Sequence, residues 1–178
     1  MFEEYLKDSS EFFKVASNAR KENDEITARR YYRVTIMCLF SSIEAFVNYN
    51  AQSYAEAMNI DLLIINFLND KDQYFSPTNG IKDRRKYNSI DDKLKTLIYM
   101  FDKNYDFCNS KEWSHFISLK EFRDSIIHSR KIEDETPLSD YNNLIKKGFN
   151  ATVQLMDLIL NGLFKRPLRK QITDLVPE

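Results

Sequence analysis

Apolar residues recur at helical spacing along most of the chain, with few interruptions. Phe2, Leu6, Phe13 and Ala16 share one face of a first segment. The stretch from residue 36 to residue 47 is almost wholly apolar, which is typical of a central, buried helix. The pattern predicts helices over about residues 2–22, 24–59, 61–69, 90–102, 111–129 and 140–164.

Short polar residues precede several of these segments and are candidate N-caps. They are Asp24, Ser89, Ser110 and Ser139. The stretch 71–88, KDQYFSPTNGIKDRRKYN, contains proline, asparagine and glycine, so it is expected to be a long excursion between core helices.

Composition supports a helical fold. The 178 residues suit one domain, and they include only 3 Gly and 4 Pro. An all-β chain of this size would need more turn residues. The sequence therefore predicts an all-α, up-and-down bundle of about five main helices. We expect a single domain over residues 1–178, with a core at about 25–164 and a loosely held tail at 165–178.

Charge, cysteines and hydropathy narrow the functional classes. The net charge of −1 lacks a global polycationic signature, so any RNA contact would be local. Cys38 and Cys108 form no CxxC and no ligand cluster, so no metal or cofactor is expected. The first residues lack the apolar region of a signal peptide, and the run IMCLF is too short to span a membrane. A cytoplasmic protein is the expectation.

The stretch RDSIIHSR, residues 123–130, contains the most distinctive polar pattern. Arg123 falls within the apolar arc of its predicted helix, where an unpaired charge is costly. Asp124 and His128 are four residues apart, so Asp124 is placed to accept a hydrogen bond from His128 and to fix its tautomer. A cation, a histidine and a carboxylate are the groups that proton transfer on a phosphodiester needs.

Glu44 is a second unusual charge, because it lies within the apolar central helix. Asn48 follows one turn later on the margin of the same apolar stripe. We expect Glu44, together with Asn48, to support Arg123.

These residues resemble the HEPN superfamily (higher eukaryotes and prokaryotes nucleotide-binding). Its members are bundles of four or five helices, and its ribonucleases carry R-x4–6-H, usually with a polar residue after the arginine. Here RDSIIH supplies Arg123, Asp124 and His128, and IEAFVN, residues 43–48, is similar to the family's early helix with an acidic or polar residue. The resemblance covers roughly residues 25–164.

The resemblance implies a metal-independent endoribonuclease whose site is composed at a homodimer interface. Arg123 would bind the scissile phosphate, His128 would transfer a proton and Asp124 would orient one of them. The products would be a 2′,3′-cyclic phosphate and a 5′-hydroxyl. Many prokaryotic members are toxins or antiviral-defence effectors with an antitoxin partner. One subgroup carries a modifiable tyrosine two residues after the histidine, where this chain has Arg130.

Other interpretations of the same residues stay open. Arg123 and His128 also fit a structural salt bridge and a helix-end histidine. Lys82, Arg84 and Arg85 are possible RNA contacts, as is Arg130, yet basic strings are more often solvated faces. The alternatives to a ribonuclease are a non-catalytic HEPN-like module, which binds nucleotide, RNA or a partner protein, and a helical dimerisation protein.

Overall fold

The computed structural model of the chain describes residues 1–57, 61–104, 106–128 and 134–177. It is mostly helical, at 72% helix, so the predicted helical fold is confirmed. The elements are α1 (Phe2–Lys21), α2 (Glu25–Ala57), α3 (Leu62–Leu68), β1 (Lys71–Ser76), β2 (Gly80–Arg85), α4 (Ile90–Tyr99), the 3₁₀ turn η1 (Asp106–Asn109), α5 (Lys111–Ile127), α6 (Leu138–Phe164) and α7 (Lys170–Thr173).

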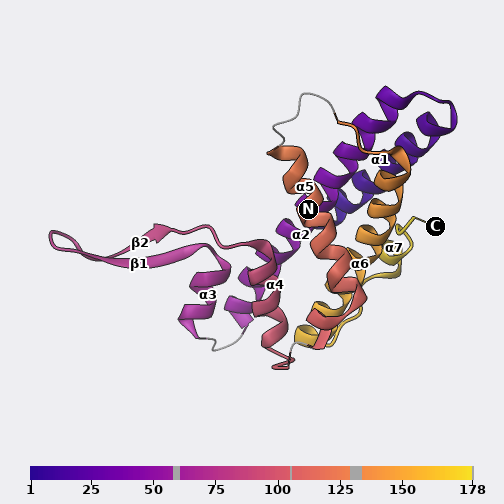
Figure 1. Cartoon of the computed structure of the whole chain (residues 1–178). Coiled ribbons are helices and arrows are strands. Elements are labelled where there is room, and N and C mark those ends of the chain that lie inside the picture. Colours follow the sequence, from indigo (N-terminus) through magenta and orange to yellow (C-terminus); the bar gives the residue numbers. More distant parts are fainter. Residues whose placement is uncertain (58–60, 105, 129–133, 178) are drawn as a thin grey trace.

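Four long helices form the body of the molecule (Figure 1). α1 and α2 are joined by a tight turn at Asn23, whose φ of 62° lets the chain reverse, and they pack along their length. α6 packs against both α2 and α5. The predicted central helix is confirmed, because Ile36, Leu39 and Phe46 of α2 are completely buried.

The ends of the helices follow the predicted caps at three of four positions. Asp24 accepts from the amide of Thr27, Ser89 caps α4 and Ser110 caps α5. The prediction for Ser139 is wrong, because α6 already begins at Leu138. Pro137 precedes it with φ −57° and ψ 139°; the proline ring fixes this φ, and the following residues then enter the helix.

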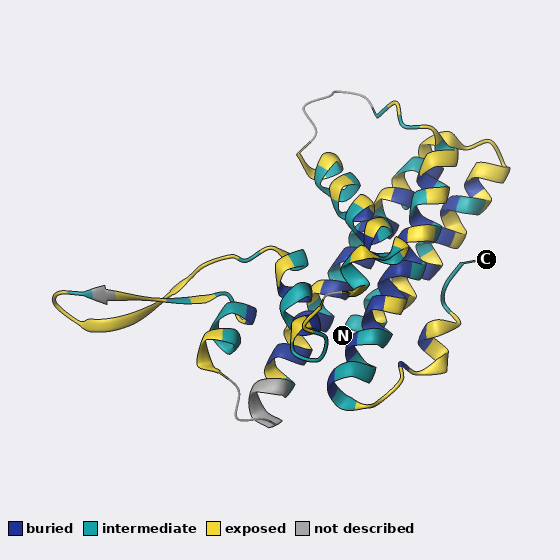
Figure 2. Cartoon of the chain, turned by 60° about the horizontal axis from the view of Figure 1, so that its bottom comes forward, coloured by how far each residue is buried: buried dark blue, intermediate teal, exposed yellow. Residues whose placement is uncertain are grey.

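Residues 71–85 form an antiparallel β-ribbon, a small two-stranded addition to the helical fold that the sequence analysis expected only as an excursion between core helices. Pro77, Thr78 and Asn79 form the loop, and Gly80 closes it with φ 71°, a conformation that glycine adopts without strain. Every residue of β2 is exposed, and the ribbon projects from the bundle (Figure 2). The strands were missed because polar residues occupy both faces, which leaves no apolar period of two.

The base of the ribbon is fastened to α4. Asp70, in a left-handed conformation with φ 56°, accepts from the backbone amides of Lys86 and Asn88. Its carboxylate also lies 2.6 Å from the ammonium of Lys93, a side chain that is only 6% exposed. A nearly buried lysine needs such a partner, so this pair fixes where the ribbon leaves the bundle.

The C-terminal segment packs against the bundle, in contrast to the loosely held tail that the sequence predicts. Leu168 and Ile172 are buried, and the hydroxyl of Ser10 donates to the carbonyl of Leu175. The backbone amide of Leu168 donates to Asp157 of α6. The burial of these two apolar side chains outweighs the two prolines here, and α7 packs against α1.

None of the described helices is long and apolar enough to cross a bilayer. The apolar residues instead form one core shared by the helices (Figure 2).

Gly162 of α6 allows the ring of Phe101 to lie against the helix. A Cβ at this position would lie 2.5 Å from two ring carbons. We expect Gly162→Ala to lower the free energy of unfolding by about 1–3 kcal/mol through overpacking. Alanine's higher helix propensity, worth about 1 kcal/mol, offsets only part of that loss. Urea denaturation followed by circular dichroism measures the change.

The control is the same substitution in a Phe101→Ala background. There the clash is gone, so Gly162→Ala is expected to be neutral or stabilising. A stabilising effect in the wild-type background would contradict the packing argument.

Candidate functional site

α5 places the Arg123–His128 motif at its C-terminal end. Ser110 begins the helix by accepting from the amide of Trp113 at 3.1 Å. His128 is the C-cap residue, and its amide donates to the carbonyl of Asp124 at 2.9 Å. The motif therefore spans the last turn of the helix, where a negative dipole end favours cations.

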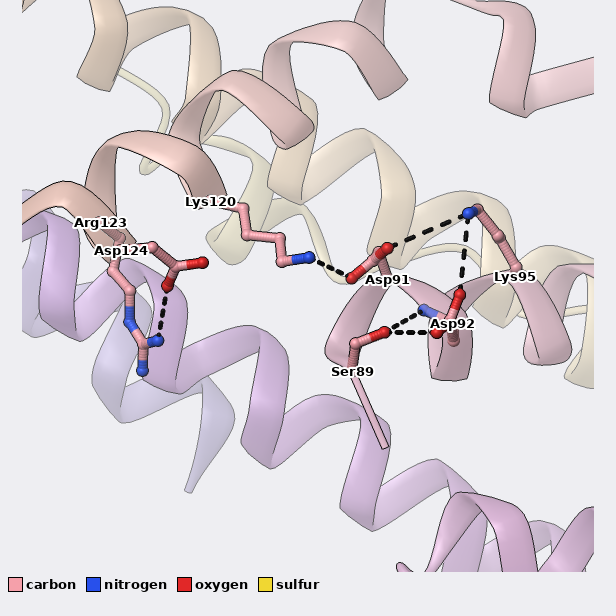
Figure 3. A network of polar contacts seen from close by, with 7 residues as sticks. All are labelled: Ser89, Asp91, Asp92, Lys95, Lys120, Arg123 and Asp124. Atoms are coloured by element: carbon pink, nitrogen blue, oxygen red, sulfur yellow. Dashed lines mark hydrogen bonds and ion pairs between the residues drawn. The ribbon is translucent and has the colours of Figure 1, made fainter. Parts of the chain in front are cut away.

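Arg123 lies at the seam between α5 and α2, and its side chain is 27% exposed. Its Nη1 donates to Asp124 at 2.9 Å (Figure 3), and its Nη2 lies 3.9 Å from Glu44, the contact expected from the sequence. The guanidinium carbon lies 4.6 Å from the centroid of the Phe40 ring, a cation–π distance. Arg123 Nε is buried and has no hydrogen-bond partner among the described residues.

The sequence suggested that the carboxylate of Asp124 accepts a hydrogen bond from His128 and orients it, but the structure shows a different partner for Asp124. Within the described residues no hydrogen bond or ion pair joins these two side chains, and Asp124 binds Arg123 instead. A charge-assisted bond to a neighbouring guanidinium is among the strong hydrogen bonds that a carboxylate can make. The imidazole of His128 is consequently left exposed at the end of the helix.

Glu44 and Asn48 line an open groove of about 490 Å³ between α2 and the start of α1. Both side chains are exposed, and Tyr5, Ser41 and Tyr49 also line the groove. Glu44 therefore lies between the groove, which it lines, and Arg123, whose Nη2 lies 3.9 Å from its carboxylate. Glu44 contacts Arg123, as expected from the sequence, whereas among the described residues no hydrogen bond joins Asn48 to Arg123.

α4 holds α5 in place through an ion pair one turn before the motif. Lys120 of α5 lies 2.5 Å from Asp91 of α4 (Figure 3). Burial raises the pKa of Asp91, but the bonds from Lys120 outweigh it, so this pKa lies below its ordinary value. Lys95 is a second, more distant cation at 4.0 Å. The Lys120–Asp91 pair holds α5 against α4 one turn before Arg123.

Between the motif and α6, the chain from Asp134 onward is bonded to α2 and α6. Asp134 accepts a hydrogen bond from the hydroxyl of Tyr141 and lies 3.8 Å from Arg29. Burial, followed by the neighbouring carboxylate, raises the pKa of the Tyr141 hydroxyl. The same arginine donates to the carbonyl of Thr136. These bonds hold the start of α6 against α2.

The possible RNA contacts lie apart from the motif. Lys82, Arg84 and Arg85 are exposed on β2, in the ribbon that projects away from the bundle (Figure 1). Arg84 is engaged by Asp72, with its Nη2 at 2.7 Å. Arg130 lies outside the described residues.

Phe40 is the residue of the site that the sequence interpretation missed. Phe40, Glu44 and Asn48 are spaced by four along α2, so they share one face. An aromatic ring four residues before a carboxylate could have predicted that an arginine from another helix stacks on the ring and pairs with the carboxylate. It was overlooked because the phenylalanine fits the apolar core equally well.

Comparison of the chain with protein-family models, with curated proteins and with solved structures gave no match. Among the described residues no group of three or more histidine, cysteine, aspartate or glutamate side chains is arranged to hold a metal ion. The function is therefore inferred from the geometry of α2 and α5.

Arg123 contributes more to stability than His128. We expect Arg123→Ala to lower the free energy of unfolding by about 1–2 kcal/mol, because it removes a stacked, partly buried cation and leaves Asp124 unpaired. His128→Ala should change it by less than about 0.5 kcal/mol, because the imidazole is exposed. Chemical denaturation of both variants measures the difference, and equal losses would contradict this assignment.

The Lys120–Asp91 pair should make stability depend on acid pH. Folding lowers the pKa of Asp91, so the pair stabilises the fold above the unfolded value of about 3.9 and is lost as pH falls through the lower folded value. We expect Asp91→Asn to cost roughly 1 kcal/mol at neutral pH and less below pH of about 3. Thermal melts across this pH range measure the effect.

Asp8→Asn is the matched control, since Asp8 is exposed on α1. A loss of stability in Asp91→Asn that stays constant down to the lowest pH would exclude the ion pair as its cause.

Proposed function

We propose that the protein is a metal-independent endoribonuclease of HEPN type, with Arg123 and His128 in a composite site at a homodimer interface. The observation that carries the proposal is a half-buried arginine, held on Phe40, one turn before an exposed histidine at the end of the same helix. A fixed cation and an exposed imidazole at the end of one helix suit phosphodiester chemistry.

In this proposal the 2′-hydroxyl of a ribose attacks the neighbouring phosphorus, and the bond to the 5′-oxygen of the next nucleotide breaks. His128 takes the proton of the 2′-hydroxyl or gives one to the leaving oxygen. Arg123 stabilises the negative charge that builds on the phosphoryl oxygens. The products are a 2′,3′-cyclic phosphate and a 5′-hydroxyl.

A homodimer would supply the groups that one copy lacks. Cyclisation needs both a base and an acid, and one protomer has a single histidine in the motif. A second copy across a two-fold axis would bring the partner's histidine and arginine to the same RNA. The groove beside Glu44, rimmed by the exposed ring of Tyr49, supports an interface on this face.

The biological setting in the proposal rests on the resemblance alone. A cytoplasmic toxin or antiviral-defence effector, restrained by an antitoxin protein, is the setting typical of small prokaryotic members.

A non-catalytic HEPN-like module, which binds nucleotide, RNA or a partner protein, is the second candidate. Arg123 already has two carboxylates within 4 Å, Asp124 at 2.9 Å and Glu44 at 3.9 Å. A cation neutralised in this way is also what a purely structural salt bridge would look like.

Cleavage of a fluorescent RNA in excess EDTA tests the enzyme. We expect the wild type to cleave, His128→Ala to be slower by about 10²–10⁴-fold and Arg123→Ala by about 10²–10³-fold. The two matched controls are His115→Ala, which removes the other histidine of α5, and Arg123→Lys, which keeps the charge without the planar fork.

Mixing the two inactive variants tests the composite site. If each site uses the arginine of one protomer and the histidine of the other, random exchange restores about a quarter of the wild-type sites. Equal cleavage by wild type, Arg123→Ala and His128→Ala would indicate a contaminating nuclease. No cleavage by any of them, on RNAs that the protein binds, would favour the second candidate.

A further inference from the structure

The β-ribbon is the part of the molecule that the proposed catalytic site does not use. All six residues of β2 are exposed, and an isolated two-stranded ribbon is only marginally stable in water. Its base is nevertheless fixed by the nearly buried pair of Lys93 and Asp70. A ribbon whose base is fixed and whose second strand is wholly exposed is arranged to bind something outside the chain.

The charge of the ribbon differs in sign from that of the whole chain. Residues 71–87 contain five basic and two acidic residues, which gives +3, whereas the chain carries −1. This concentration of positive charge on a projecting element attracts polyanions. This positive charge favours a nucleic acid over an acidic patch on a partner protein, because phosphates repeat along the whole length of a nucleic-acid strand.

Two like charges face each other across the ribbon. Lys71 lies directly opposite Arg85 in the strand register, a pairing that destabilises an antiparallel ladder. Among the described residues neither has a carboxylate within ion-pair distance, whereas Arg84 on the other face is paired with Asp72. An anion between Lys71 and Arg85 would turn this repulsion into attraction.

An aromatic ring adjoins Arg85, one of the two cations. The guanidinium of Arg85 lies 6.0 Å from the centroid of the Tyr87 ring, which is 79% exposed. On the same face Asp83 accepts from Gln73 at 3.3 Å, so that carboxylate already has a donor. Cations beside exposed aromatic rings bind the phosphates and the bases of single-stranded nucleic acids.

We propose that Lys71, Arg85 and Tyr87 form a binding subsite for single-stranded RNA on the β-ribbon, with the two cations on a phosphate and the tyrosine under a base. The choice of RNA as the polyanion rests on the proposed function, while the charge and the exposed ring are properties of the ribbon itself. The subsite lies apart from Arg123, so it binds a flanking part of the strand rather than the scissile phosphate.

Binding of a fluorescein-labelled oligouridylate to the full chain with His128→Ala tests the subsite without cleavage. Fluorescence anisotropy over a series of salt concentrations gives both the affinity and the number of phosphates bound. We expect Lys71→Ser together with Arg85→Ser to reduce the slope of log affinity against log salt by about 0.7, the value for the one phosphate that the two cations share. Tyr87→Ser should weaken binding about tenfold with little change of slope.

The matched control is Lys111→Ser together with Lys147→Ser, which removes two exposed lysines outside the ribbon. An unchanged slope in the ribbon variant, or an equal change in the control, overturns the subsite. Tighter binding of duplex RNA with the same dependence on the ribbon overturns the single-strand assignment. A ribbon variant that sediments as a smaller species than the parent shows a protein interface instead.

The two proposals fail separately. Binding that depends on the ribbon, in a wild type that cleaves no RNA, leaves the subsite standing and removes the ribonuclease. Cleavage that depends on His128, with binding indifferent to the ribbon, does the reverse.

Discussion

The guanidinium of Arg123 imposes the main constraint on this fold. It lies on the Phe40 ring between α2 and α5, in an arc of residues that otherwise bury apolar surface. A charge in such a place must be compensated, and Asp124 and Glu44 supply two carboxylates from two different helices. The packing of α5 on α2 therefore also determines where the Arg123–His128 motif lies.

α4 connects this seam to the β-ribbon. Asp91 binds Lys120 of α5, and Lys93, two residues along, binds Asp70 at the base of the ribbon. Two ion pairs on one short helix thus fix two elements that share few other contacts. Both pairs are partly buried, so salt screens them less than it screens surface pairs. The base of the ribbon and α5 are thus both attached to the same helix.

The sequence predicted the helices well, but it predicted less well which of several neighbouring side chains bind one another. Helical spacing and three N-caps placed most helices, because these signals are local. The ribbon escaped notice since its strands are polar on both faces. The expected bond from His128 to Asp124 failed because spacing shows only which groups can meet. It does not show which of two neighbours, Arg123 or His128, the carboxylate prefers.

That preference has a consequence for the proposed chemistry. In the free protein Asp124 occupies the guanidinium edge that a phosphate would need, through a charge-assisted bond of 2.9 Å. Only Glu44, at 3.9 Å, is loose enough to be displaced easily. RNA would therefore have to replace a carboxylate rather than fill an empty site, and it gains by doing so only if other contacts hold the strand. The proposed flanking subsite on the ribbon would supply such contacts, so binding there and displacement of Asp124 would act together on the same substrate.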